Sequence, residues 1–115
     1  MQLIKPKFSV KILSDAEQFI LSLDKKVQQK ITYNIAKATY VIDNTLFKKL
    51  EGSDIWEFRT LYAGNCYRLL AFWDIDAKSL VVATHGFVKK TDKTPKNEIE
   101  RAESIRTQYF NSKKN

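Results

Sequence analysis

The residues whose types could do chemistry are cations placed inside apolar runs of this 115-residue sequence. Arg59 and Arg68 each interrupt a stretch of aromatic and aliphatic residues. An unpaired cation in such a place costs several kcal/mol, so each arginine needs an anion. Lysines gather immediately after a third apolar run, at Lys89 and Lys90. Given these lysines, phosphate is the simplest anion to suppose, since the planar guanidinium group binds it through paired hydrogen bonds.

Two interpretations remain open for each arginine. Arg68 lies in the middle of an apolar run, where it either pairs with Glu57 on a neighbouring strand or clamps a phosphate. Arg59 lies nearer the end of its run, where a solvated position and a ligand role are both open.

The only histidine, His85, precedes a run of four lysines, namely Lys89, Lys90, Lys93 and Lys96. Its ordinary pKa near neutrality makes His85 the best general acid or base in the chain, although a lone histidine is often structural. The lysines form either a solvated face or an anion site beside the start of the last helix. With arginines for the phosphate and a titratable group for the protons, this set of residues suits metal-free cleavage of RNA by its own 2′-OH.

Two further side chains have open roles. Tyr109 belongs either to the buried stripe of the last helix or to a surface that stacks on bases. Cys66 could pair with His85 as a nucleophile, but nothing in the sequence marks its thiol as activated. One histidine and one cysteine are too few for a zinc site, and we expect no metal and no cofactor.

Composition indicates one folded domain over residues 1–115, since 43% of the residues are hydrophobic and 12% aromatic. No apolar run approaches the roughly 20 residues of a membrane span. The apolar stretch at the N-terminus is too short for a signal peptide. A single cysteine fits a reducing compartment, so we expect a cytoplasmic protein. The net charge of +7 is concentrated in residues 1–54 and 89–115, which favours a polyanionic partner.

The expected fold is α+β. Residues 8–12 alternate like a short strand, and Ser14 with Glu17 forms a capping box that starts a helix at Asp15. Asp24 is a second N-cap, and the following helix runs to about residue 43. Residues 44–54 read as irregular.

Three strand-like runs follow at residues 55–60, 66–73 and 80–88, with a hairpin turn at residues 63–65. Thr94 as N-cap and Pro95 as first helical residue open a last helix, with a frayed tail over residues 111–115. We expect a three-stranded antiparallel meander with the first strand at an edge and the helices on one face.

Several of these segments resemble the RelE/ParE superfamily of bacterial toxins, in its HigB-like, phage-derived branch. The resemblance lies in Leu50-Glu51-Gly52, in Ile55-Trp56-Glu57-Phe58-Arg59, in Tyr67-Arg68-Leu69, and in the block from His85 to Pro95 with its Lys-Lys-Thr-x-Lys-Thr-Pro pattern. The order of elements expected above matches the same superfamily, so the resemblance covers most of the chain.

The resemblance implies a RelE-like fold and a ribosome-dependent endoribonuclease that enters the ribosomal A site and cuts mRNA, leaving a 2′,3′-cyclic phosphate. It implies that Arg68 holds the scissile phosphate and that Lys89 and Lys90 stabilise the transition state. His85 and Tyr109 are the candidate proton-transfer groups, and Arg59, Lys93 and Lys96 the further RNA-binding residues. The implied partner is an antitoxin, often with a helix-turn-helix domain.

Two alternatives stay open on the same fold. One is a protein-binding inhibitor like the gyrase-poisoning ParE toxins, which act without residues that cut RNA. The other is an inert relative that acts only as a binding partner.

Overall fold

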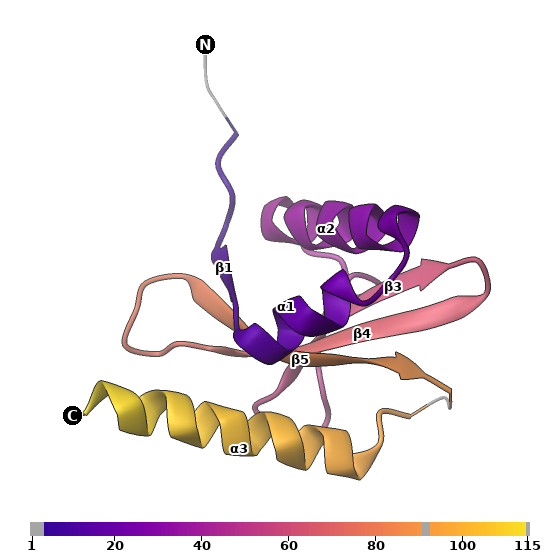
Figure 1. Cartoon of the computed structure of the whole chain (residues 1–115). Helices are drawn as coiled ribbons and strands as arrows, with labels where there is room; N and C mark the ends of the chain where they lie inside the picture. Colours follow the sequence, from indigo (N-terminus) through magenta and orange to yellow (C-terminus); the bar gives the residue numbers. More distant parts are fainter. Residues whose placement is uncertain (1–3, 91–92, 115) are drawn as a thin grey trace.

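The computed structural model describes residues 4–90 and 93–114 and contains one mixed sheet with helices on both sides (Figure 1). The strand order is β1-β5-β4-β3-β2, in which β1 and β5 are parallel and every other pair is antiparallel. The elements in chain order are β1 (Ser9–Ile12), α1 (Ser14–Leu21), α2 (Lys25–Tyr40), β2 (Phe47–Lys49), β3 (Trp56–Tyr62), β4 (Asn65–Trp73), β5 (Leu80–Lys89) and α3 (Lys96–Lys113).

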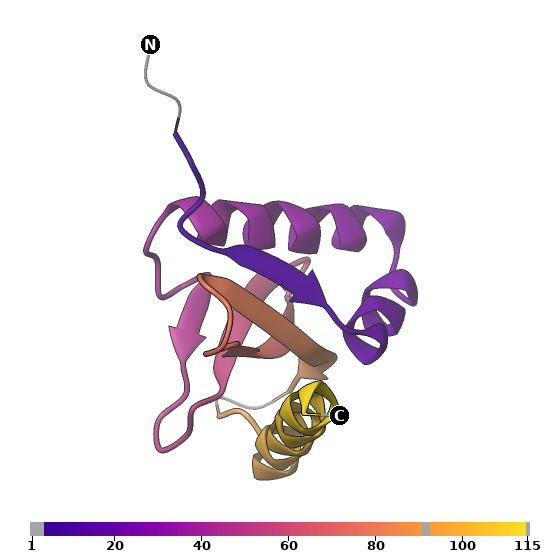
Figure 2. The same ribbon diagram turned by 90° about the vertical axis from the view of Figure 1, so that its left-hand side faces the viewer.

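The predicted meander is confirmed as β3, β4 and β5. The turn between β3 and β4 contains Ala63 and Gly64, whose φ angles are 51° and 81°. Two successive positive φ angles are the geometry of the tight hairpin turn whose twist matches that of its strands. The predicted edge position of the first strand is also confirmed, since β1 is the first strand in the sheet order and lies beside β5 (Figure 2).

The expectation of an irregular segment over residues 44–54 was wrong in part, because β2 lies within it and forms the other edge of the sheet. This strand has three residues, Phe47, Lys48 and Lys49, and the two lysines are exposed. So short and charged a strand leaves almost no alternation in the sequence. Lysines are typical of edge strands, where they discourage pairing with another chain.

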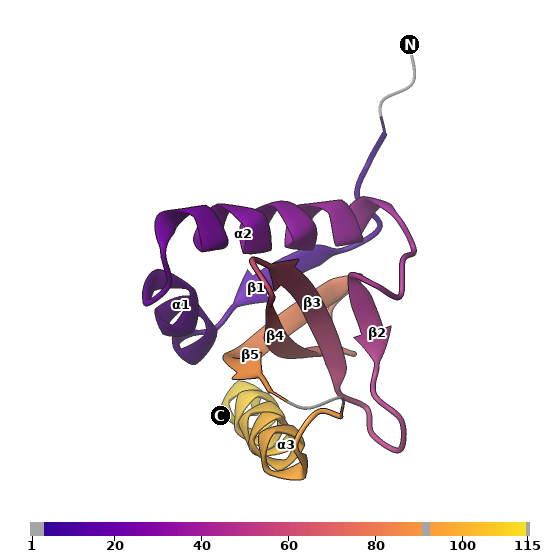
Figure 3. The ribbon, with the colours of Figure 1, turned by 90° about the vertical axis from the view of Figure 1, so that its right-hand side faces the viewer.

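The helices cover both faces of the sheet rather than the single face that we expected (Figure 3). Helices α1 and α2 pack on one face, against a core that includes Phe58, Leu69 and Val81. Helix α3 packs on the other face, where Ala102 meets Leu70, Phe72 and Val82. Alternate residues of β4 point to opposite faces, so this central strand is buried on both.

Each of the three helices has at least one boundary that differs from the predicted one. Helix α1 begins at Ser14 with Leu13 as N-cap, and the backbone N–H of Glu17 donates to the carbonyl of Leu13 in place of a capping box. Helix α2 starts after Asp24, as predicted, but ends at Tyr40. Helix α3 has Pro95, not Thr94, as N-cap and continues to Lys113 through most of the predicted tail, while residue 115 lies outside the described residues.

A β-bulge interrupts the pairing of β4 with β5. Leu70 lies opposite His85, but the next residue, Ala71, lies opposite Ala83, so Thr84 is an extra residue. The Thr84 hydroxyl donates a hydrogen bond to the carbonyl of Leu70 over 3.1 Å. A bulge reverses the alternation of side chains along its strand, so it decides which face of the sheet each half of β5 serves.

Candidate functional site

The register of three strands brings the predicted cations together on the face that α3 covers in part. Arg59 of β3 lies opposite Arg68 of β4, and Lys89 of β5 lies opposite Cys66, two residues from Arg68. Residues two apart on one strand share a face, as do residues directly opposite on neighbouring strands. We call Arg59, Arg68 and Lys89 the cationic cluster.

Within residues 4–90 and 93–114, one carboxylate pairs with the cationic cluster, that of Glu57, which is 1% exposed. Its Oε1 is 3.1 Å from Arg68 Nε and 3.4 Å from Arg59 Nε. Its Oε2 accepts a short hydrogen bond from the Thr94 hydroxyl, which ties the segment before α3 to the sheet. In this described part of the chain, three cations share one carboxylate, and their excess positive charge fits an added anion.

Arg68 therefore has the carboxylate partner that one of its two interpretations required. Its side chain is 8% exposed, and the 3.1 Å ion pair with Glu57 lacks hydrogen-bond geometry. Among residues 4–90 and 93–114, Arg68 Nε is the one buried side-chain nitrogen without a hydrogen bond. Because this pairing is incomplete, the Arg68 guanidinium group can bind a further anion in addition to Glu57.

Lys89 is the titratable member of the cationic cluster. Burial lowers its pKa, Glu57 acts in the opposite direction, and the charges of Arg68 and Arg59 lower it further. A lysine with a lowered pKa gives up its proton more readily than an exposed one, which suits it to general acid catalysis.

The outer part of the site is more accessible. The Arg59 side chain is 29% exposed, and its Nη1 donates to the carbonyl of Asn44 over 3.3 Å. The three remaining predicted lysines are exposed near the junction of β5 and α3, namely Lys90, Lys93 and Lys96.

His85 is buried, which argues against the acid–base role predicted for it. Its side chain is 1% exposed, its Nδ1 is 2.9 Å from Thr84 Oγ1, and its Nε2 is 3.1 Å from Glu98 Oε1. Burial and the charge of Arg101 lower the pKa of His85, although Glu98 opposes them. Both ring nitrogens are engaged, so His85 joins β5 to α3 and has none left for a substrate.

Tyr109 is engaged by Asp74 and Phe72, which argues against the catalytic role predicted for it. Its hydroxyl donates to Asp74 Oδ2 over 2.6 Å, and its ring packs edge-on against Phe72. Phe72 is four residues from Arg68 along β4, or about 13 Å in an extended strand. Tyr109 belongs to the core beneath α3, the first of its two interpretations.

The proposed pairing of Cys66 with His85 is likewise not formed. Cys66 lies opposite Lys89 and is half-buried, whereas His85 lies opposite Leu70, further along β4. Within the described ranges, no three histidine, cysteine, aspartate or glutamate side chains gather as metal ligands would. Every helix there is also too short or too polar to span a lipid bilayer.

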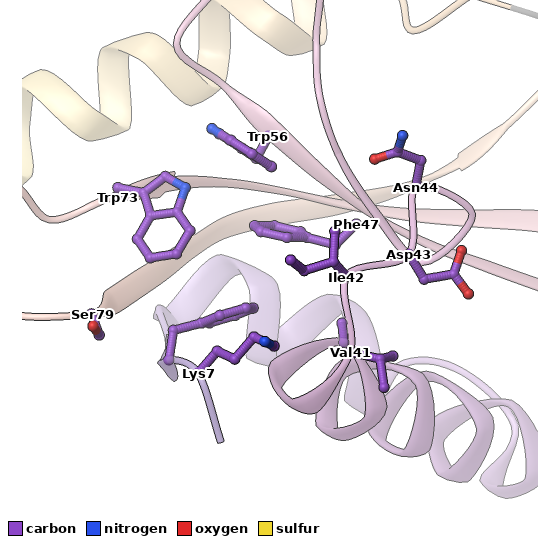
Figure 4. A pocket seen from close by; sticks show the side chains of 11 residues that line it. Lys7, Val41, Ile42, Asp43, Asn44, Phe47, Trp56, Trp73 and Ser79 are labelled. Carbon is purple, nitrogen blue, oxygen red and sulfur yellow. The ribbon is translucent and has the colours of Figure 1, made fainter. Parts of the chain in front are cut away.

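An apolar cavity of about 350 Å³ lies on the opposite face of the sheet. Figure 4 shows Phe47, Trp56 and Trp73 gathered around it with Ile42, beyond the end of α2. Its charged lining residues are Lys7 and Asp43. These two opposite charges give the cavity no surplus of cations for a phosphate, and we therefore consider the candidate reaction at the cationic cluster.

Sequence reasoning missed two side chains of the site. Lys48 of β2 lies opposite Glu57 and adds a fourth cation to this face, but it could not be placed because β2 was not predicted. Thr94 was interpreted as a helix cap, a role that its position before a proline favoured, whereas its hydroxyl binds Glu57.

Comparison with models of known protein families identifies the family of this chain. Residues 18–107 match the family described as phage derived protein Gp49-like (DUF891), and the chain belongs to this family. A search of curated protein sequences finds no match.

Solved structures of RelE toxins share the fold. A double arginine-to-alanine mutant of Escherichia coli RelE in the free state matches with a TM-score of 0.60 and 19% identity, covering 89% of this chain and 98% of that one. The RelBE2 toxin–antitoxin complex of Mycobacterium tuberculosis matches with a TM-score of 0.55 and 18% identity, over 77% and 98% of the two chains. The intact E. coli RelBE complex gives 0.51 and 20%, over 75% and 99%. The α+β fold is therefore RelE-like, as expected.

Proposed function

We propose that this chain is the toxin of a toxin–antitoxin pair and cuts mRNA on the ribosome. The observation that carries the proposal is the cationic cluster, in which three cations share the carboxylate of Glu57. Its surplus of positive charge suits a phosphate that gains negative charge as it reacts. Membership of the Gp49-like family and the RelE-like fold support the same activity.

The reaction needs no metal and no protein nucleophile. The ribose 2′-oxygen attacks the adjacent phosphorus, the bond from phosphorus to the 5′-oxygen breaks, and the products carry a 2′,3′-cyclic phosphate and a 5′-OH. Arg59 and Arg68 hold the phosphate and stabilise its added charge. Lys89 donates a proton to the leaving 5′-oxygen, and the exposed Lys90, Lys93 and Lys96 bind neighbouring phosphates.

The proton of the 2′-OH needs an acceptor from outside the described part of the chain. His85 is enclosed and Tyr109 is distant, so neither is proposed for this step. We propose that ribosomal RNA or a water molecule held at the A site accepts it, which makes the reaction depend on the ribosome. Because the proposed substrate is ribosome-bound mRNA, we propose that the protein acts in the cytoplasm.

The proposed partner is a cognate antitoxin with a helix-turn-helix domain. The M. tuberculosis and E. coli relatives were solved as toxin–antitoxin complexes, which supports a protein partner for this chain. Co-expression with the neighbouring gene should restore growth if that gene encodes the antitoxin.

Induction of the chain followed by mapping of mRNA 5′ ends tests the nuclease. We expect new 5′-OH ends inside translated codons within minutes, and their loss in Arg59→Gln and Lys89→Gln. Lys26→Gln is the matched control, because it removes one exposed cation from α2 on the other face of the sheet. If both cluster variants cut mRNA as the wild type does, the cluster is not the active site.

A protein-binding inhibitor is the second candidate, favoured by the burial and ion pairing of Arg68. On this alternative the cations stabilise the sheet, and the toxin acts like ParE on gyrase. DNA damage with intact mRNA would establish it, whereas absence of any growth effect would indicate an inert relative.

A further inference from the structure

Glu57 meets both arginines in the same way. Its Oε1 lies 3.1 Å from Nε of Arg68 and 3.4 Å from Nε of Arg59, so one oxygen forms an ion pair with the inner nitrogen of both guanidinium groups. Like charges this close repel each other, and the carboxylate between them offsets that repulsion.

These contacts leave one outer nitrogen of each guanidinium group, Nη2, available. Nη1 of Arg59 and of Arg68 donates to a backbone carbonyl, that of Asn44 at 3.3 Å and that of Tyr67 at 3.4 Å. Nη2 of either arginine forms no hydrogen bond within residues 4–90 and 93–114. Because Nε is the only fully buried unbonded side-chain nitrogen of this part of the chain, Nη2 of Arg68 keeps some contact with solvent.

We propose that Glu57 is a positioning residue, which holds Arg59 and Arg68 side by side with their Nη2 atoms directed at one shared phosphate. The inference rests on the proposed function and adds a residue that does not touch the substrate. Glu57 is 1% exposed and is fixed on its other oxygen by Thr94, so it remains in place when a phosphate binds. Binding then costs little reordering of the two long side chains, which are already fixed.

The positioning role and simple electrostatics predict opposite changes in phosphate affinity when Glu57 loses its charge. Removal of a negative charge from a phosphate site should tighten phosphate binding. If Glu57 positions the two arginines, Glu57→Gln should weaken binding instead, because the guanidinium groups lose their common anchor. The matched control is Glu17→Gln, which removes the same charge from the exposed surface of α1 on the other face.

The first measurement uses the wild-type chain with inorganic phosphate as the probe and follows the arginine Nε–Hε signals by NMR. We expect phosphate to shift the Lys89 and Arg59 side-chain signals, while Hε of Arg68 stays slow to exchange with water. Accelerated exchange of Hε of Arg68 on phosphate addition would mean that phosphate displaces Glu57, and would overturn the proposal without any variant.

The second measurement compares the variants with the same probe. Glu57→Gln should raise the Kd for phosphate at least threefold and speed the exchange of both Hε protons at least tenfold, and Glu17→Gln should do neither. Tighter phosphate binding in Glu57→Gln overturns the positioning role alone. Wild-type arginine and lysine signals that ignore phosphate overturn the proposed function and this inference together. If Glu57→Gln does not fold, the wild-type titration decides.

Discussion

Replacing Gly86 with alanine should loosen α1 from the sheet. Gly86 of β5 faces α1, and a Cβ built there would lie 2.2 Å from Cδ2 and 2.8 Å from Cγ of Phe19. Ordinary van der Waals contact begins near 3.4 Å, so the ring would have to move by about 1 Å. Because Cγ is close to the backbone of α1, a rotation of the ring alone does not relieve the overlap, and the helix itself must shift.

Overpacking of this kind costs about 1–3 kcal/mol. For a chain of 115 residues, each kcal/mol lowers the Tm by about 4 °C. The assay is urea unfolding of the wild type, Gly86→Ala, Phe19→Ala and the double variant. Once the ring is gone, alanine at position 86 should cost almost nothing, so the cycle should give a coupling energy of at least about 1 kcal/mol. Additive effects, within about 0.5 kcal/mol, would refute the steric argument.

Three further predictions concern Tyr109, His85 and Lys89. Tyr109→Phe should lower the free energy of unfolding by about 1–2 kcal/mol through loss of a hydrogen bond to the buried Asp74, and leave mRNA cleavage by the folded protein unchanged. His85 has a lowered pKa in the folded state, so the unfolded chain takes up its proton first; urea titrations should show stability falling as the pH drops below about 6.5, less steeply in His85→Gln. If Lys89 acts as the acid, cleavage of ribosome-bound mRNA should decline at a pH below the ordinary lysine value of 10.5, and Lys89→Arg should be slower but lack this decline.

Most of the sheet could be predicted because its strands follow simple alternation. Trp56 and Phe58 alternate with Glu57 and Arg59, and the structure places the two pairs on opposite faces, as the sequence predicted. The convergence of Arg59 with Arg68 follows from that alternation together with the length of the hairpin turn. β2 could not be predicted, since a strand of three residues is fixed by its neighbour β3 rather than by its own pattern.

The position of α3 depends on contacts with residues that are distant in sequence, so the sequence of the helix alone does not predict it. A buried stripe on a helix predicts that the helix packs against a sheet, but not against which face. The sequence alone therefore left a catalytic interpretation of Tyr109 open. In the structure its hydroxyl donates a hydrogen bond to Asp74, which is far from it in sequence. Lys113 binds the same carboxylate, and α3 continues to this residue, inside the segment predicted as a tail.

The bulge at Thr84 explains how one strand serves both the apolar core and the charged site. The first half of β5 places Val81 and Ala83 beneath α1 and α2, and without an extra residue strict alternation would place Lys89 on that same apolar face. The extra residue reverses the alternation, so His85 and Lys89 join the face of Arg68 and Glu57. Sequence periodicity places a lysine at the end of the strand, but the bulge decides that it lies beside the arginines.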